Sequence, residues 1–222
     1  MQARTHSHYL FSLIMRLHLL LLFLVLQSTS IHAQQFSVGA SFGVNASQIS
    51  GDGYSGFNKA GISAGLFSTT RINENFDFQF EINYTERGSR KNARPSEDDN
   101  DFFLLRMPYV EIPFMIRYHK NKFTYEAGLS YSRLLSYYLE DENGSFEIEP
   151  QLNQFNNNDF AFLFGVNFNF TDNLIMNWRF NTSFLPFREY DSGSNELPFD
   201  AGMYHHYVGF VMKYQFLGSY GK

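Results

Sequence analysis

The chain of 222 residues is 44% hydrophobic and 18% aromatic, with 26 Phe and 14 Tyr, and it carries a formal net charge of −5. An acidic chain without clustered Lys and Arg is a poor match for nucleic acid, because phosphate binding depends on such clusters. The absence of Cys excludes a disulfide scaffold and thiolate metal sites, and we expect neither a metal nor a cofactor.

The N-terminal residues 1–33 predict a cleavable signal peptide. A basic segment precedes the apolar run Leu19 to Leu26, and a small residue stands where cleavage would occur. Either Met1 or Met15 can be the initiator. The apolar run is shorter than the roughly 20 residues that a membrane-spanning helix requires, so a helical anchor is the weaker alternative. Residues 34–222 are therefore expected to form the mature protein, as a single domain.

Eight segments of this mature region alternate bulky side chains with small or polar ones, which predicts β-strands. Along residues 160–170, five Phe residues and Val166 take one side, and Ala, Leu, Gly and Asn take the other. The segment 174–184 repeats this pattern, with Trp178 on the aromatic side and Arg179 on the polar side. The predicted strands are 36–46, 60–71, 76–88, 103–119, 123–138, 159–170, 174–186 and 203–216.

The direction in which the aromatic faces point decides the class of protein. A closed barrel of about eight strands has an interior that side chains just fill, and this number of aromatic rings would overfill it. With the rings outside, the interior receives Gly, Ser, Asn and a few charges, and such an apolar outer surface is stable only in lipid. The sequence therefore predicts an all-β fold, an eight-stranded antiparallel up-and-down transmembrane β-barrel. A secreted soluble barrel with its aromatic rings inside is the alternative.

The lengths of the connections favour a location in the bacterial outer membrane. Short links near 73–75, 120–122 and 171–173 alternate with long links near 47–59, 88–101, 140–158 and 188–202. Outer-membrane barrels have short periplasmic turns and longer extracellular loops. Both ends of the mature chain would then lie on the periplasmic side.

The long links carry clusters of carboxylates, such as Glu97 to Asp101 and Glu140 to Glu142. A calcium site or a cation bridge to lipopolysaccharide is one interpretation of these groups. They lack the regular ligand spacing of a defined calcium loop, so we expect ordinary solvated loops. Outer-membrane lipid and lipopolysaccharide are the surroundings in which these loops would lie, and they are expected partners of the protein.

The segment Tyr109 to Tyr118, followed after a short turn by Phe123 to Gly128, resembles the PorT-like outer-membrane β-barrel family of Bacteroidetes-type bacteria. A Gly-rich opening hairpin and an aromatic closing strand add to the resemblance. The resemblance implies a small barrel in the outer membrane. The family takes its name from a member associated with protein secretion and gliding, but no secretion-specific motif is recognised in this sequence.

The last predicted strand, 203–216, ends in the aromatic residue Phe216. This ending is similar to the signal by which barrel-assembly machinery recognises its clients, which implies that this machinery is a partner during biogenesis. Most such proteins stop at the aromatic residue, whereas this chain continues to Lys222.

Six charged residues fall on the predicted inward faces, and they are Glu81, Glu111, Arg117, Glu126, Arg179 and Lys213. Lone buried charges are costly, so these three acids and three bases are expected to pair across the lumen. Such a network would fill the barrel, although the same charges could line water in a channel. Pro113 predicts a bulge that could exchange inward and outward faces between Glu111 and Arg117.

His205 and His206 suggest two activities, a metal site or a lipid-modifying esterase in which Ser183 is the nucleophile. Adjacent strand residues point to opposite faces, so the two histidines cannot bind one ion unaided. No sequence signature links Ser183 to His205, and we expect no catalytic residue and no enzymatic activity.

The expected function is therefore structural. The barrel would anchor its extracellular loops or serve as a subunit of a secretion or envelope complex, with a protein partner in that complex. A narrow porin-like channel for small solutes is the first alternative, and a lipid-modifying enzyme is the second.

Overall fold

Strands dominate the protein, in agreement with the period-two alternation of its sequence. This computed structural model describes residues 36–148, 155–189 and 202–217. The predicted signal peptide, with its boundary at residue 33, lies outside the described residues. The long strands in the described ranges are β1 (Phe36–Ser50), β2 (Lys59–Arg71), β3 (Phe76–Lys91), β4 (Phe103–Lys120), β5 (Phe123–Leu134), β8 (Asn158–Asn169), β9 (Leu174–Ser183) and β11 (Gly202–Leu217).

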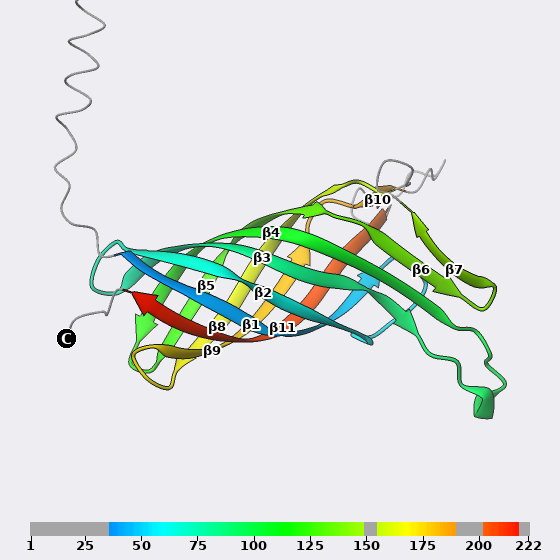
Figure 1. Ribbon diagram of the computed structural model, residues 1–222, viewed down its shortest axis with the longest axis horizontal. Coiled ribbons are helices and arrows are strands. Elements are labelled where there is room, and N and C mark those ends of the chain that lie inside the picture. The colour runs from blue at the N-terminus through cyan, green and yellow to red at the C-terminus, as the bar shows by residue number, and fades with distance from the viewer. Residues whose placement is uncertain (1–35, 149–154, 190–201, 218–222) are drawn as a thin grey trace, which may run out of the picture. The chain divides into compact units, whose positions relative to one another are not determined.

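These long strands close into a barrel (Figure 1). Each pairs antiparallel with the next long strand along the chain, and β1 also pairs with β11 from Val38 to Ser50. Every described barrel strand thus has a partner on both sides, which satisfies the condition for crossing a membrane with strands. The all-β, antiparallel up-and-down barrel predicted from the sequence is confirmed. No helix in the described ranges is long and apolar enough to cross a membrane.

The alternating side chains of β8 show which way the aromatic rings point. Phe160, Phe162 and Phe164 lie on the outer surface with 39%, 44% and 53% of their area exposed. Ala161 and Leu163, which lie between them in the chain, are fully buried. The most strongly alternating segment of the sequence therefore turns its rings away from the lumen.

The strands β9 and β3 show the same division. Trp178 is 54% exposed on the outer wall, whereas its neighbour Arg179 is 5% exposed in the lumen. On β3, Ile82 points outward and Glu81 is buried. An outer surface of large apolar side chains around a charged interior is stable in lipid and not in water. The predicted outward orientation of the rings is confirmed.

The two ends of the barrel differ in the length of their connections. Short turns join β2 to β3, β4 to β5 and β8 to β9 at the end where β1 begins and β11 finishes, on the left in Figure 1. We call this the short-turn end. The opposite, long-loop end carries the hairpin of β6 (Tyr137–Asp141) and β7 (Gly144–Ile148). In outer-membrane barrels the short-turn end faces the periplasm.

The predicted strand 123–138 is wrong in its C-terminal part. β5 ends at Leu134, and the chain then starts β6 at Tyr137, which continues the ladder along β4. Leu134 and Tyr137 are both buried although they are three residues apart, a spacing that one strand of period two cannot satisfy. The chain therefore breaks between them, and part of the predicted long loop is a hairpin.

Other boundaries differ by a few residues from those expected. β1 extends to Ser50, β3 extends to Lys91, and β9 ends at Ser183. Two small elements stand in the long connections, the 3-10 helix η1 (Pro95–Glu97) and the strand β10 (Arg188–Glu189), which pairs with β11.

Pro113 produces no bulge, contrary to the expectation from the sequence. β4 pairs with β5 in one unbroken register from Tyr109 to Lys120, and its register with β3 is the same on both sides of the proline. Pro113 lacks an N–H, so it removes a local bridge to β3 without shifting the strand. Glu111 and Arg117 therefore keep the same parity, and both are buried in the lumen.

Candidate functional site

Charged side chains from four strands meet inside the barrel. The guanidinium of Arg179 on β9 lies 2.9 Å from both Glu81 on β3 and Glu126 on β5, and Lys213 on β11 lies 2.8 Å from Glu81. Each of these four residues, the central cluster, is at most 5% exposed. Because β3 and β9 are not neighbours in the sheet, the ion pair between Arg179 and Glu81 spans the lumen.

Amide side chains complete the hydrogen bonding of the two carboxylates in the central cluster. Gln79 and Asn83 donate to Glu81, while Asn167 and Asn177 donate to Glu126 at 2.8 and 2.9 Å. A buried ion pair is tolerated when further hydrogen bonds satisfy its remaining lone pairs. The central cluster meets this condition.

A second charged group lies nearer the long-loop end. Arg87 on β3 is 2.8 Å from Glu111 on β4 and 2.7 Å from Asp159 on β8, and all three side chains are fully buried. The hydroxyl of Tyr207 donates to Glu111 at 2.9 Å. The guanidinium carbon of Arg87 lies 5.0 Å from the ring centroids of both Tyr207 and Tyr109, so cation–π contacts add to the ion pairs.

Arg117 lies apart from both groups, near the short-turn end. Its side chain is almost fully buried, with Nη1 at 3.8 Å from Asp77 and 3.4 Å from the hydroxyl of Thr69. Asp77 is also hydrogen-bonded to His119, whose other ring nitrogen lies 3.0 Å from Thr124. A cavity of about 190 Å³ is lined by Arg117 and His119, among other residues.

The six charges expected from the sequence therefore fall into three separate groups. Glu81, Glu126, Arg179 and Lys213 meet in the central cluster, whereas Glu111 and Arg117 each bond to partners outside the expected set. Sequence reasoning assigned no pair to Arg87, which bonds Glu111, or to Asp77, which bonds Arg117, and it did not place Asp159 beside Arg87.

Strand parity could have placed these missing residues in the lumen. Asp77 and Arg87 lie on β3 at even spacing from Glu81, and Asp159 lies on β8 at even spacing from Leu163. All three are buried, as that spacing requires. The sequence therefore carried the signal that these three residues face the lumen, although not the signal for which groups they pair with.

An apolar cluster occupies the interior at the long-loop end, where β4 begins and β1 finishes. Its members are at most 6% exposed, and they are Ile49, Leu105, Met107, Tyr109, Leu134, Tyr137 and Phe187. Sequence reasoning placed only small, polar and charged residues inside the barrel. The alternation of Leu105, Met107 and Tyr109 with outward residues on β4 is the signal that indicates this cluster.

His205 and His206 point to opposite faces of β11, as the strand period predicts. The Nε2 atom of the buried His205 lies 2.9 Å from the hydroxyl of Tyr109, and its ring stacks on Phe187 with centroids 4.1 Å apart. This ring nitrogen is thus bonded to a tyrosine and not to Ser183. Within the described ranges, no three His, Cys, Asp or Glu side chains are grouped to hold a metal ion.

The loop between β3 and β4 pairs its own charges. Lys91 donates to Asp99 at 2.9 Å and to Asp101 at 3.1 Å, and Arg94 lies 3.3 Å from Glu97. The hydrogen bond from Lys91 holds the pKa of Asp99 below its usual value. In this loop, three of the carboxylates that suggested a cation site therefore pair with basic residues of the same loop, and they are Glu97, Asp99 and Asp101.

A closed antiparallel barrel with aromatic rings outside and ion pairs inside defines a small barrel protein of the bacterial outer membrane. The chain belongs to the family of outer membrane protein beta-barrel domains, whose family model matches residues 28–188. This family covers the barrel from its first strand to the connection after β9. No curated protein matches the sequence.

Solved outer-membrane proteins resemble the chain at low identity. The attachment invasion locus protein Ail of Yersinia pestis is 13% identical with a TM-score of 0.47, over 82% of this chain and 99% of that chain. Another structure of Ail is in complex with the heparin analogue sucrose octasulfate, at a TM-score of 0.45. Neisserial surface protein A is 12% identical with a TM-score of 0.47, over 82% of this chain and 97% of that chain.

Proposed function

We propose that this outer-membrane barrel is a non-enzymatic structural and interaction protein, which presents its long loops and its β6–β7 hairpin to partners in the envelope. The observation that carries the proposal is the ion-paired interior, in which Arg179 connects Glu81 and Glu126 from three separate strands. Such an interior supports a rigid platform for the extracellular surface.

The central cluster opposes the passage of solutes. A permeating ion or sugar would have to displace Arg179 or Lys213 from Glu81, and separating a buried pair leaves uncompensated charge in the lumen. The apolar cluster around Tyr109 and Phe187 lies further along the same interior, at the long-loop end. These two layers favour a filled barrel over a conducting one.

The β6–β7 hairpin is the feature best suited to contact a partner. β6 extends the ladder of β4, pairing Phe103 with Asp141 and Arg106 with Tyr138, and Arg106 also lies 5.8 Å from the Tyr138 ring centroid. The hairpin projects at the long-loop end in Figure 1. A surface held by a continuous ladder loses less conformational entropy on binding than a flexible loop does.

The resemblance of Tyr109 to Tyr118 to PorT-like proteins supports a finer version of this proposal. In that version the barrel is a subunit of a secretion system or another envelope complex. Lipopolysaccharide surrounds the outer wall, and barrel-assembly machinery inserts the protein.

Replacing residues 138–147 of the hairpin, which leaves the buried Tyr137 in place, with a short Gly-Ser linker tests the proposal. The pairings that close the eight long strands do not involve β6 or β7, so the variant should insert and lose partners that co-purify with the full chain from native membranes. A variant with the same linker in place of the β3–β4 loop serves as the matched control. Recovery of the same partners from both variants and from the full chain would contradict the interaction proposal.

A narrow channel is the second candidate, because the cavity beside Arg117 opens the lumen at one end. Conductance of the purified protein in planar bilayers distinguishes the two functions. The filled barrel predicts no stable single-channel steps. Steady conductance that increases in a Glu81→Gln variant would favour the channel instead.

A further inference from the structure

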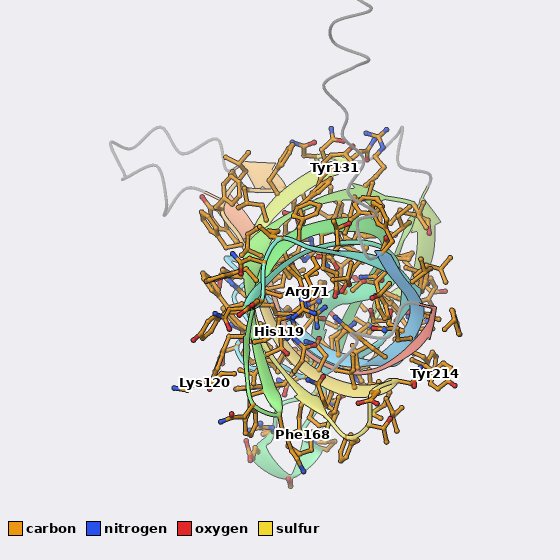
Figure 2. The ribbon with its side chains drawn as sticks, turned by 90° about the vertical axis from the view of Figure 1, so that its left-hand side faces the viewer. Arg71, His119, Lys120, Tyr131, Phe168 and Tyr214 are labelled. Carbon is orange, nitrogen blue, oxygen red and sulfur yellow. The ribbon has the colours of Figure 1, made fainter. Side chains whose placement is uncertain are left out.

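The cavity at the short-turn end is lined by side chains of both strands and turns. It measures about 190 Å³, and its lining includes Arg71, Arg117, His119, Ile175 and Gln215. Figure 2 looks at this end of the barrel and shows Arg71 and His119 near the centre of the opening, whereas Lys120 points away at the periphery. A solute in the periplasm would reach the lumen here first.

The buried guanidinium of Arg117 uses few of its hydrogen-bond donors. Of its five N–H groups, Nη1 makes one long bond of 3.4 Å to Thr69, and the buried Nε has no partner among the described residues. Its ion pair with Asp77 is 3.8 Å long. By contrast, Arg179 bonds carboxylates through Nε, Nη1 and Nη2, each at 2.9 Å.

Incomplete bonding at a buried Arg is costly unless a ligand completes it, because each desolvated donor without a partner destabilises the fold. The planar fork of a guanidinium matches two oxygens of a carboxylate or a phosphate. We infer that the short-turn cavity binds a small oxyanion, a phosphate or carboxylate group, with the guanidinium of Arg117, which lines the cavity, as its main ligand.

The other charged residues at the cavity restrict which anions can enter. Arg71 donates to the backbone carbonyls of Asn73 and Glu74 and so holds the β2–β3 turn at the rim. Glu74 and Asp172 also line the cavity, and the carboxylate of Asp77 contacts both the guanidinium of Arg117 and the ring of His119. These carboxylates repel extended polyanions, so the site is built for a compact ligand with a single anionic group.

Calorimetric titration of the refolded barrel in detergent tests the inference, with inorganic phosphate and acetate as separate ligands. At least one of them should saturate a single site, and the ligand that binds identifies the chemistry of the natural anion. Arg117→Gln should weaken binding about tenfold or more, because hydrogen bonds to a charged group are lost. Arg117→Lys should bind more weakly than the wild type, since it keeps the charge but lacks the fork.

Lys120→Gln is the matched control, because Lys120 is an exposed cation of the same strand outside the cavity lining. It should bind the anion as the wild type does. If Arg117→Gln does not fold, NMR titration of the wild type serves as the test instead. The nitrogen resonance of Arg117 Nε should then shift as the anion is added. Absence of binding by both anions, or equal affinity in the Arg117 and Lys120 variants, overturns the inference.

Discussion

Arg179 is the residue on which the interior of the barrel depends most. Its three bonding nitrogens contact Glu81 and Glu126 at 2.9 Å, and Lys213 supplies the second positive charge of the cluster. Two buried carboxylates with one remaining cation would carry an uncompensated charge. The packing of the barrel interior therefore depends on the ion pairs among four residues from four strands.

Replacing Arg179 with Met should lower the free energy of unfolding by about 3–5 kcal/mol, because one buried charge loses its partner. Reversible urea unfolding in lipid vesicles measures this change. Lys120→Met, at an exposed position, should change the same quantity by less than about 0.5 kcal/mol. A loss below about 1 kcal/mol in Arg179→Met would show that the cluster does not stabilise the barrel.

Asp99 should titrate below the usual aspartate pKa of about 3.9, because Lys91 donates to its carboxylate. Because the pKa of Asp99 is lowered in the folded protein, the contact stabilises the loop at pH values above the unfolded-state pKa. This stabilisation is lost as the pH falls through the lowered, folded-state pKa. NMR titration of the Asp99 carboxyl carbon measures this directly. Lys91→Gln should raise the pKa toward the usual value, and an unchanged pKa in that variant would refute the assigned cause.

Strand parity was sufficient to place Glu81, Glu126 and Arg179 inside, because alternation along a strand is a local property. Parity could not pair them. Which side chains meet across the lumen depends on strand order, stagger and closure, and these are properties of the whole barrel. For that reason Glu111 was assigned to the right face without its true partner, Arg87, which has the same parity.

The strands were predicted from the alternation of bulky and small side chains. The prediction is wrong where burial of apolar residues in the interior competes with this alternation. β5 ends early because Leu134 and Tyr137 both join the interior apolar cluster at odd spacing. A sequence pattern shows alternation but not which apolar residues of a long connection turn back into the lumen. Alternation alone therefore predicts a continuation of β5 followed by a loop where the structure has a hairpin.

Pro113 illustrates how much a strand tolerates when its neighbours keep their register. Changing Pro113 to Ala restores a donor facing β3, worth about 0.5–1.5 kcal/mol, and adds chain entropy to the unfolded state, worth about 0.4–1 kcal/mol. The two nearly cancel, so the free energy of unfolding should change by less than about 1 kcal/mol. Leu129→Pro, in a fully paired part of β5, should destabilise the barrel clearly in the same urea assay.

A change above about 2 kcal/mol in Pro113→Ala would contradict this reading of the register. Such a change would indicate that Pro113 stabilises the backbone conformation of β4, and that the strand does more than tolerate the proline.

The molecule as a whole is a ladder closed by β1 and β11, with its charges inside and its rings outside. Its fold was predictable from the sequence, because alternation, connection length and aromatic content all indicate one architecture. The layered interior of the barrel was not predictable from the sequence. The apolar cluster and the incompletely bonded Arg117 result from the stagger of strands that are distant in sequence.

The aromatic wall of the barrel faces acyl chains, and the chain's single Trp reports on this orientation. Trp178 is 54% exposed on the outer wall of β9. Its fluorescence in phospholipid vesicles should be quenched strongly by lipids brominated on their acyl chains and weakly by acrylamide in the water. Strong quenching by acrylamide with no effect of brominated lipid would contradict the orientation of the barrel wall.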